Sequence, residues 1–228
     1  GGWWVRGASG GGVGVAALAI TLARGEGGGM PDVRRELRVL TRPQVLLALG
    51  TTVMGAGGMF TLYTYVAPVL QSMTEATPNF VTLSLVIIGL GFTIGNWLGG
   101  RLADWSLDGS TKLFLAALAL IMLALPFVLP SKAGALLGLL VWGIATFAIV
   151  PPVQIRVMQA AAEAPGLAAS VNIGAFNLGN ALGAAAGGAV ISAGWGYASV
   201  SWAGAALAAA GLSLVIGGSR SARRLASA

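Results

Sequence analysis

The chain has 228 residues, of which 56% are hydrophobic and 9% are charged, and its net charge at pH 7 is +6. A water-soluble domain does not carry this much apolar surface, so the composition indicates a membrane protein. Because the chain contains no cysteine and no histidine, we expect no disulfide, thiol nucleophile, imidazole base, metal site or bound cofactor. The basic residues lie beside apolar runs and do not form one patch, which favours membrane flanks over nucleic acid as their partner.

The first 42 residues are the least regular part of the sequence. The chain begins with Gly1 and not Met, so we interpret it as a fragment that lacks its start. Residues 1–23 contain a weak apolar run, Gly7–Ala23, that predicts a partial membrane helix. Residues 24–42 follow as a linker with glycines, arginines and apolar residues at helical spacing. The linker fits a cytoplasmic segment ending in a short interfacial helix, and it fits a disordered basic loop equally well.

Residues 43–219 predict a six-helix bundle, because they contain six charge-free apolar runs. A membrane helix needs about 20 apolar residues, and a charge at its centre costs about 2.5–3.5 kcal/mol. Glycines in Gly194–Tyr197 divide the last uncharged stretch into two spans. The expected spans are Gln44–Leu70, Phe80–Gly100, Leu113–Leu129, Ala133–Ile155, Ala168–Ala193 and Val200–Gly218.

The basic residues predict the orientation of these spans. If successive spans cross in alternating directions, two basic residues fall on one side, Arg6 and Lys132. The others fall on the opposite side: Arg24, Arg34, Arg35, Arg38, Arg42, Arg101, Lys112, Arg156, Arg220, Arg223 and Arg224. The crowded side is cytoplasmic by the positive-inside rule. Residues 220–228 are therefore expected to be a cytoplasmic tail.

An internal repeat relates the two halves of the bundle. Gly91–Gly100 reads GFTIGNWLGG and Ala175–Ala184 reads AFNLGNALGA, 84 residues later, and the same offset places Val66–Val69 (VAPV) on Val150–Val153 (VPPV). Glycine, alanine and leucine are abundant here, so a chance match stays open. Each copy holds three spans, and an odd number forces the second copy to enter the membrane from the other side. The sequence therefore predicts two inverted three-helix repeats, a device of secondary transporters whose substrate site lies near the midplane.

Polar and aromatic residues within the spans are the candidates for a substrate cavity. The asparagines can either form hydrogen bonds between helices or line the cavity, since an unpaired amide in lipid costs several kcal/mol. The aromatic residues can line the cavity, fill the core or face lipid. The cavity candidates are Met59, Tyr63, Asn96, Trp142, Asn172, Phe176 and Asn180. No acidic residue lies deep within a span, so proton coupling by an intramembrane carboxylate is not expected in this part of the protein.

Glycines and prolines predict how the helices pack and where they bend. Glycine every fourth residue lets two helix backbones approach closely, in a bundle that is either rigid or mobile. The predicted packing glycines are Gly91, Gly95, Gly99, Gly179, Gly183 and Gly187. Prolines at 68, 151 and 152 are expected to break or kink their helices.

One segment carries the resemblance to a known family. Gly95–Lys112, GNWLGGRLADWSLDGSTK, resembles the G-x-L-A-D-R-x-G-R-K motif of the major facilitator superfamily. It departs from the motif at Trp105 and in the spacing before Gly109, which puts a full charge relay in doubt. Glu163–Tyr197 is similar to the eleventh helix of the arabinose-efflux-like branch of drug:proton antiporters, and Arg42–Gln71 to its seventh helix.

The resemblance implies an all-α fold: the C-terminal six-helix half of a twelve-helix transporter, with residues 1–23 as the end of the preceding helix. It implies a proton-coupled exporter of sugars or drug-like molecules in a bacterial inner membrane. Its partners would be the lipid bilayer, a small-molecule substrate, the absent N-terminal six-helix half and protons bound by that half. By analogy the cytoplasmic gate would contain Gly100, Arg101, Asp104 and Lys112.

Other functions stay open or are disfavoured at this point. The same charges at the cytoplasmic end are compatible with ordinary positive-inside anchoring and a helix cap. A non-transporting scaffold or sensor is the alternative function. An intramembrane enzyme would need clustered acidic residues, histidine or cysteine within the spans, and the sequence has none, so we expect no enzymatic activity.

Overall fold

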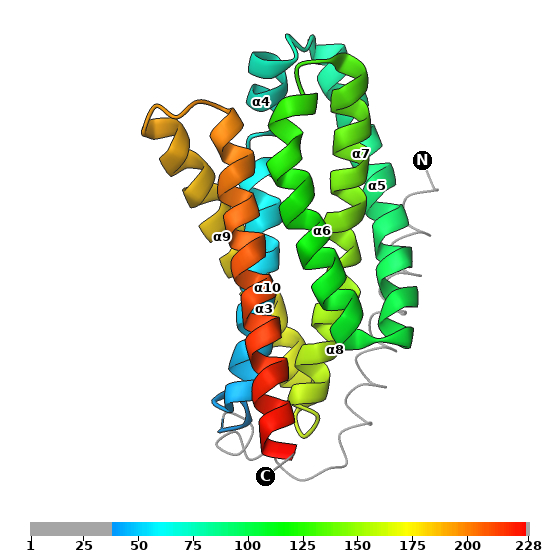
Figure 1. The fold of residues 1–228 in the computed structure, drawn as a ribbon, viewed down its shortest axis with the longest axis vertical. Helices are drawn as coiled ribbons and strands as arrows, with labels where there is room; N and C mark the ends of the chain where they lie inside the picture. The colour runs from blue at the N-terminus through cyan, green and yellow to red at the C-terminus, as the bar shows by residue number, and fades with distance from the viewer. Residues whose placement is uncertain (1–37, 227–228) are drawn as a thin grey trace, which may run out of the picture. The chain divides into compact units, whose positions relative to one another are not determined.

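The computed structural model describes residues 38–226, with side chains to residue 219, and this part of the chain forms helices joined by short connections (Figure 1). No strand occurs among these residues, so the predicted all-helical fold class is confirmed. The expected span at 7–23 and most of the linker at 24–42 lie outside the described residues. The helices are α3 (Pro43–Tyr63), α4 (Val66–Met73), α5 (Pro78–Trp105), α6 (Leu107–Val128), α7 (Lys132–Ala148), α8 (Val150–Ala160), α9 (Pro165–Ser192) and α10 (Ala198–Ala226).

Within this described part, five helical segments are long and apolar enough to cross a membrane: Pro43–Tyr63, Pro78–Trp105, Leu107–Val128, Lys132–Ala160 and Ala198–Ser219. They coincide with five of the six expected spans. The sixth, at 168–193, forms the continuous 28-residue helix α9 but does not meet the same hydropathy criterion. It carries no charged residue. Its asparagines and glycines lower its hydropathy, and it packs along α3.

Two of the expected spans are interrupted, each once. The first breaks at Thr64 and Tyr65, between α3 and α4, and the second breaks at Ile149, between α7 and α8. Each break lies shortly before a proline, Pro68 in α4 and Pro151 in α8. Proline has no N–H, and its ring clashes with the carbonyl four residues earlier, so helical hydrogen bonding cannot continue across these points. The expected proline breaks are therefore confirmed.

Glycines let two pairs of helices pack with their backbones in contact. In the α5–α7 seam, a Cβ added to Gly95 would lie 2.3 Å from the carbonyl oxygen of Ile144. In the α3–α9 seam, a Cβ added to Gly183 would lie 2.3 Å from the carbonyl oxygen of Gly57. The other expected packing glycines would meet atoms of the facing helix or its end at 2.3 to 2.7 Å: Gly91, Gly99, Gly179 and Gly187. Neither seam has room for a side chain.

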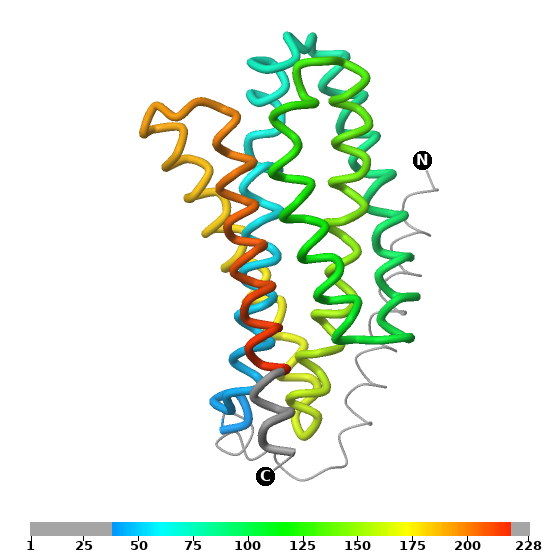
Figure 2. The backbone as a smooth tube through the Cα atoms, in the orientation of Figure 1, coloured from blue at the N-terminus to red at the C-terminus, as the bar shows by residue number. Residues whose placement is uncertain are grey.

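These seams interleave the two three-helix units, one from α3 to α6 and the other from α7 to α10. The second helix of each unit packs against the first helix of the other unit, so that α5 contacts α7 and α9 contacts α3. The third helices, α6 and α10, contact each other. The α5–α6 connection lies at one end of the helices and the α9–α10 connection at the opposite end (Figure 2). The units therefore run in opposite directions, as predicted for an inverted repeat.

The offset between the two units is not constant along the chain. The break positions Tyr65 and Ile149 are 84 residues apart, as predicted. The first glycines of the two seams, Gly91 and Gly179, are 88 residues apart, so the predicted alignment of Gly95 with Gly179 is wrong by one helical turn. Three of these four residues come from the helices that follow the breaks, since α4 has 8 residues and α8 has 11.

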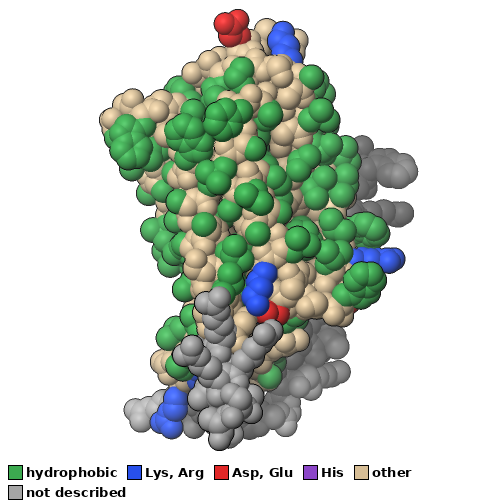
Figure 3. Space-filling view, in the orientation of Figure 1, with side chains coloured by type: hydrophobic (Ala, Val, Ile, Leu, Met, Phe, Trp, Pro, Cys, Tyr) green, Lys and Arg blue, Asp and Glu red, His purple; other side chains and the backbone are tan. Residues whose placement is uncertain are grey.

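The outer surface of this bundle is apolar. The face in Figure 3 is covered by hydrophobic side chains, with charged side chains only towards its two ends. Large exposed residues on α5 and α6 include Val86, Leu90, Leu120 and Phe127. An apolar surface of this extent is unstable in water, whereas in a bilayer it faces hydrocarbon.

Candidate functional site

Six aromatic side chains from four helices form a connected cluster, in which Trp142 is buried and the other five are partly exposed. The aromatic cluster consists of Phe60 and Tyr63 of α3, Phe92 of α5, Trp142 and Phe147 of α7, and Phe176 of α9. Phe92 and Phe147 stack with their ring centroids 4.0 Å apart, and Tyr63 stacks on Trp142 at 6.5 Å. Phe60 bridges to Phe176 through an edge contact at 5.6 Å. The aromatic cluster therefore draws its side chains from the first and second helices of both three-helix units.

Tyr63 and Trp142 differ in exposure although their rings are stacked. Trp142 is 0% exposed, whereas Tyr63 is 38% exposed. The Nε1 donor of Trp142 is buried and has no hydrogen-bond partner among the described residues. A buried indole N–H normally finds an acceptor, because leaving it unpaired costs free energy. The exposed ring of Tyr63 can contact the flat face of a solute such as a sugar or an aromatic molecule.

The structure brings some of the predicted cavity residues together and separates others. Tyr63, Trp142 and Phe176 lie in the aromatic cluster. Met59 is buried behind it, where it and Phe176 line a void of about 10 Å³ that is too small for a solute. Asn180 follows Phe176 by one helical turn and is partly buried.

The remaining predicted asparagines have different surroundings. Asn96 follows Phe92 by one helical turn and is exposed. Asn172 precedes Phe176 by one helical turn and is buried: its Oδ1 accepts a hydrogen bond from the Thr52 hydroxyl at 2.8 Å, and its Nδ2 donates to Gln154. This amide network links α3, α8 and α9. Asn172 therefore makes the interhelical hydrogen bonds that were the alternative to cavity lining.

The sequence analysis missed three members of the aromatic cluster: Phe60, Phe92 and Phe147. A signal for one of them was present in the repeat. The 84-residue offset, which holds for the first helices of the two units, places Phe147 on Tyr63. Aromatic residues at matching positions of an inverted repeat are expected at the interface of its copies.

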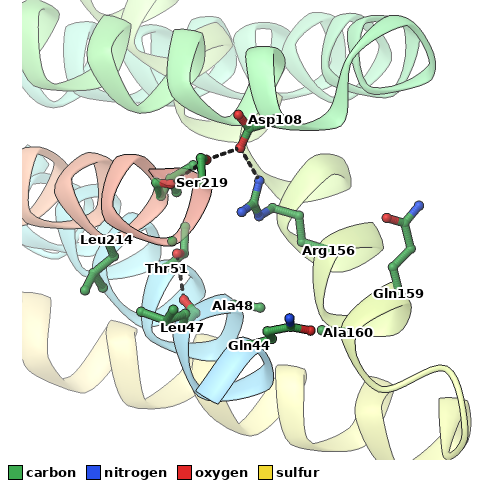
Figure 4. A pocket seen from close by; sticks show the side chains of 12 residues that line it. Gln44, Leu47, Ala48, Thr51, Asp108, Arg156, Gln159, Ala160, Leu214 and Ser219 are labelled. Atoms are coloured by element: carbon green, nitrogen blue, oxygen red, sulfur yellow. Dashed lines mark hydrogen bonds and ion pairs between the residues drawn. The ribbon is translucent and has the colours of Figure 1, made fainter. Parts of the chain in front are cut away.

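At the end of the bundle that holds the α5–α6 connection, Asp108 is the centre of a charge cluster. It forms an ion pair with Lys112 one turn along α6. Its Oδ1 accepts hydrogen bonds from the guanidinium of Arg156 in α8 at 3.0 Å and from the hydroxyl of Ser219 in α10 at 2.8 Å (Figure 4). One carboxylate thus connects three helices. The partners lie 48 and 111 residues away, so sequence spacing gave no indication of this pairing.

The other predicted gate residues have no part in this charge cluster. Arg101 is exposed and its guanidinium lies 5.3 Å from the centre of the Trp97 ring. Asp104 is exposed and has no ion pair among the described residues. Gly100 has open space where a Cβ would lie. Of the predicted gate residues, Lys112 is the one that the structure places in the charge cluster.

A second ion pair connects the start of α3 to the α8–α9 connection. The Arg42 guanidinium donates to both carboxylate oxygens of Glu163, at 2.9 and 3.0 Å. The hydrogen bonds to Glu163 raise the pKa of Arg42 above its usual value. Both side chains are about half exposed, so the pair contributes little to stability and mainly orients the connection.

The charge cluster borders a cavity of about 440 Å³, which we name the boundary cavity. Its lining comes from α3, α6, α8 and α10 (Figure 4). Polar lining residues include Gln44, Thr51, Asp108, Arg156, Gln159 and Ser219, and apolar ones include Leu47, Leu214 and Val215. Among the described residues, no group of three or more potential ligands could hold a metal ion.

Comparison with known proteins assigns the family. Residues 2–184 match the model of the Major Facilitator Superfamily. The chain is 64% identical over 186 residues to the Inner membrane transport protein YdhP of Escherichia coli O157:H7, covering 82% of this chain and 48% of that protein. It is 30% identical over 169 residues to the Putative transporter AraJ of E. coli K12, covering 73% of this chain and 42% of AraJ.

A third relative is a Probable sugar efflux transporter of Helicobacter pylori, 30% identical over 163 residues, covering 70% of this chain and 41% of the relative. The chain spans about half the length of the curated relatives it matches. The family match covers most of the chain and agrees with the helical bundle and the resemblance of the Gly95–Lys112 motif. The chain therefore belongs to the major facilitator superfamily.

Proposed function

We propose that this chain is the C-terminal half of a secondary active transporter that exports sugars or drug-like small molecules by alternating access. The observation that supports this most directly is the aromatic cluster, built from both three-helix units of an inverted repeat. In transporters with inverted repeats the substrate binds near the membrane midplane, at the interface of the repeats. The names of the relatives, inner membrane transport protein and sugar efflux transporter, favour export across a bacterial inner membrane.

In this proposal the aromatic cluster forms one wall of the substrate cavity. Tyr63 offers its exposed ring to the flat face of a solute, and it is held in place by Trp142 and by Phe60, which also contacts Phe176. Asn96 and Asn180, each one turn beyond an aromatic residue, offer amide groups to hydroxyls of the substrate. Met59 and Asn172 support the wall from behind. The opposite wall belongs to the N-terminal half.

The charge cluster belongs to the proposed cytoplasmic gate. Asp108 and Lys112 form an ion pair at this end, whereas Asp104 has none among the described residues. Gly100, Arg101 and Asp104 lie at the same α5–α6 connection and are exposed enough to meet the N-terminal half. During alternating access, contacts at this end would form and break, while the helix pairs α5–α7 and α3–α9, each joined by a glycine seam, would move as rigid bodies.

Proton coupling is assigned to the N-terminal half. The described acidic residues lie at the ends of helices or in connections: Glu75, Asp104, Asp108 and Glu163. Asp108 is neutralised by two cations and is unsuited to carry a proton through the membrane. The distribution of the basic residues supports a cytoplasmic location for the α5–α6 connection and the C-terminus by the positive-inside rule.

Flux measurements test the proposal. The protein that joins this chain to an N-terminal six-helix half is reconstituted in proteoliposomes, with radiolabelled arabinose and the dye ethidium as probes. We expect a proton gradient to drive transport of at least one probe.

Tyr63→Ala should lower this flux about tenfold through loss of ring contact, while Trp202→Ala on α10 should leave it unchanged. Flux that ignores the gradient would refute proton coupling, and flux through the 228-residue chain alone would refute its assignment as a half.

A further inference from the structure

The boundary cavity changes from polar to apolar along the direction of the helices. Gln44, Asp108, Gln159 and Ser219 each lie at the end of a candidate membrane span or one residue inside it. Four to eight residues inside these spans, the lining includes the apolar Leu47, Leu214 and Val215, together with Arg156 and with Thr51, whose hydroxyl donates to the carbonyl oxygen of Leu47. The cavity therefore has a polar rim at the depth where a bilayer meets water and an apolar wall within the hydrocarbon. An amphiphile matches this gradient better than a fully soluble molecule does.

The charges at the rim favour an anion. Asp108 accepts from Lys112, Arg156 and Ser219, so its carboxylate is fully engaged and two cations face one acid. Nη1 of Arg156 donates a hydrogen bond to Asp108, and the other guanidinium nitrogens of Arg156 have no partner among the described residues. A guanidinium with free donors binds phosphate oxygens in a geometry that it matches well. The amides of Gln44 and Gln159 supply further donors at the same rim.

We propose that the boundary cavity binds a phosphate group, with Arg156 as its principal ligand, and that the apolar wall favours an anionic phospholipid as its source. In Figure 3 a basic and an acidic side chain lie next to each other in the lower half of the face that carries the hydrophobic side chains. This site is distinct from the aromatic cluster and does not depend on transport.

Binding to the purified chain in detergent tests this proposal. Native mass spectrometry and thermal unfolding are measured with phosphatidylglycerol, with phosphatidylcholine and with inorganic phosphate. We expect phosphatidylglycerol to bind and stabilise, and phosphatidylcholine to bind at least about tenfold more weakly, because its choline offsets the phosphate charge. Inorganic phosphate that binds as well as the anionic lipid would assign the site to a soluble phosphate. Equal binding of both lipids, with no effect of phosphate, would overturn the proposal.

Two variants with matched controls locate the binding. Arg156→Gln should weaken phosphatidylglycerol binding about tenfold, while Lys132→Gln, which removes one exposed positive charge outside the cavity lining, should not. Gly218→Leu places a side chain in the cavity and keeps every ion pair, so it tests occupancy without disturbing Asp108. Its neighbour Gly217 has open space around it, and Gly217→Leu is the control. Binding that is unchanged in both Arg156→Gln and Gly218→Leu would refute the site.

Discussion

At the scale of single residues, Trp142 combines a structural and a functional constraint. Its side chain is the largest among those that are fully buried, and its ring contacts Tyr63 and Phe92. The same side chain has an indole N–H without a partner in the described part of the chain. Such a group costs stability. Tyr63, which stacks on the same ring, is itself partly exposed and is the member of this pair that a solute can contact.

Trp142→Ala should strongly destabilise the protein, because it leaves a large cavity among rings that cannot collapse into it. The expected loss is about 3–5 kcal/mol. Thermal unfolding of the purified chain in detergent measures it. Trp202 is 46% exposed on α10, so Trp202→Ala is the matched control and should change stability little. Equal effects of the two variants would show that the aromatic cluster is not part of the core.

Asn172 tests the value of a polar network within apolar helices. Asn172→Ala leaves Thr52 and Gln154 without their partner. In membrane proteins such interhelical hydrogen bonds contribute about 0.6 kcal/mol on average. A double-mutant cycle with Thr52→Ala should give a coupling energy near this value. Asn177 is exposed on the same helix, and its change to alanine should show no coupling with Thr52→Ala.

At the scale of helices, the two seams determine which pairs move together. Backbones in direct contact along three glycines leave no side chains to repack, so α5 with α7 and α9 with α3 behave as rigid pairs. The helix breaks at Tyr65 and Ile149 lie next to the aromatic cluster. Movement within a unit is therefore expected at the breaks and not at the seams.

Alanine substitutions within one helix separate the packing role of glycine from its flexibility. Gly183→Ala places a Cβ 2.3 Å from a carbonyl oxygen of α3, so the helices must separate, and a loss of about 1–3 kcal/mol is expected. Gly174 on the same helix has open space around it, and Gly174→Ala should be neutral or stabilising by up to about 1 kcal/mol. Thermal unfolding compares them, and the pair Gly95→Ala and Gly89→Ala repeats the test on α5. If the two substitutions of each pair changed stability equally, the close backbone packing at the seams would be contradicted.

At the scale of the whole molecule, patterns with local physical causes were predictable from the sequence. Charge-free runs predicted the spans and prolines predicted the breaks, because desolvation and backbone geometry act within a few residues. The pairing of Asp108 with Arg156 and Ser219 was not predictable, since it depends on how helices far apart in sequence meet. The predicted alignment of the two repeat copies was wrong for a local reason, because helix α8 is longer than helix α4. The roles of the cavity and gate residues stay predictions until transport is measured.

The inverted arrangement can be tested directly, because the chain has no cysteine to complicate labelling. Trp105, the last residue of α5, is 91% exposed, and Trp195, between α9 and α10, is 71% exposed. We expect a membrane-impermeant maleimide to label Trp105→Cys only in inside-out vesicles and Trp195→Cys only in right-side-out vesicles. The two connections lie at opposite ends of the helices (Figure 2), so a membrane across the bundle must separate them. Labelling of both cysteines from one side would exclude two oppositely directed three-helix units, and with them the proposed transport mechanism.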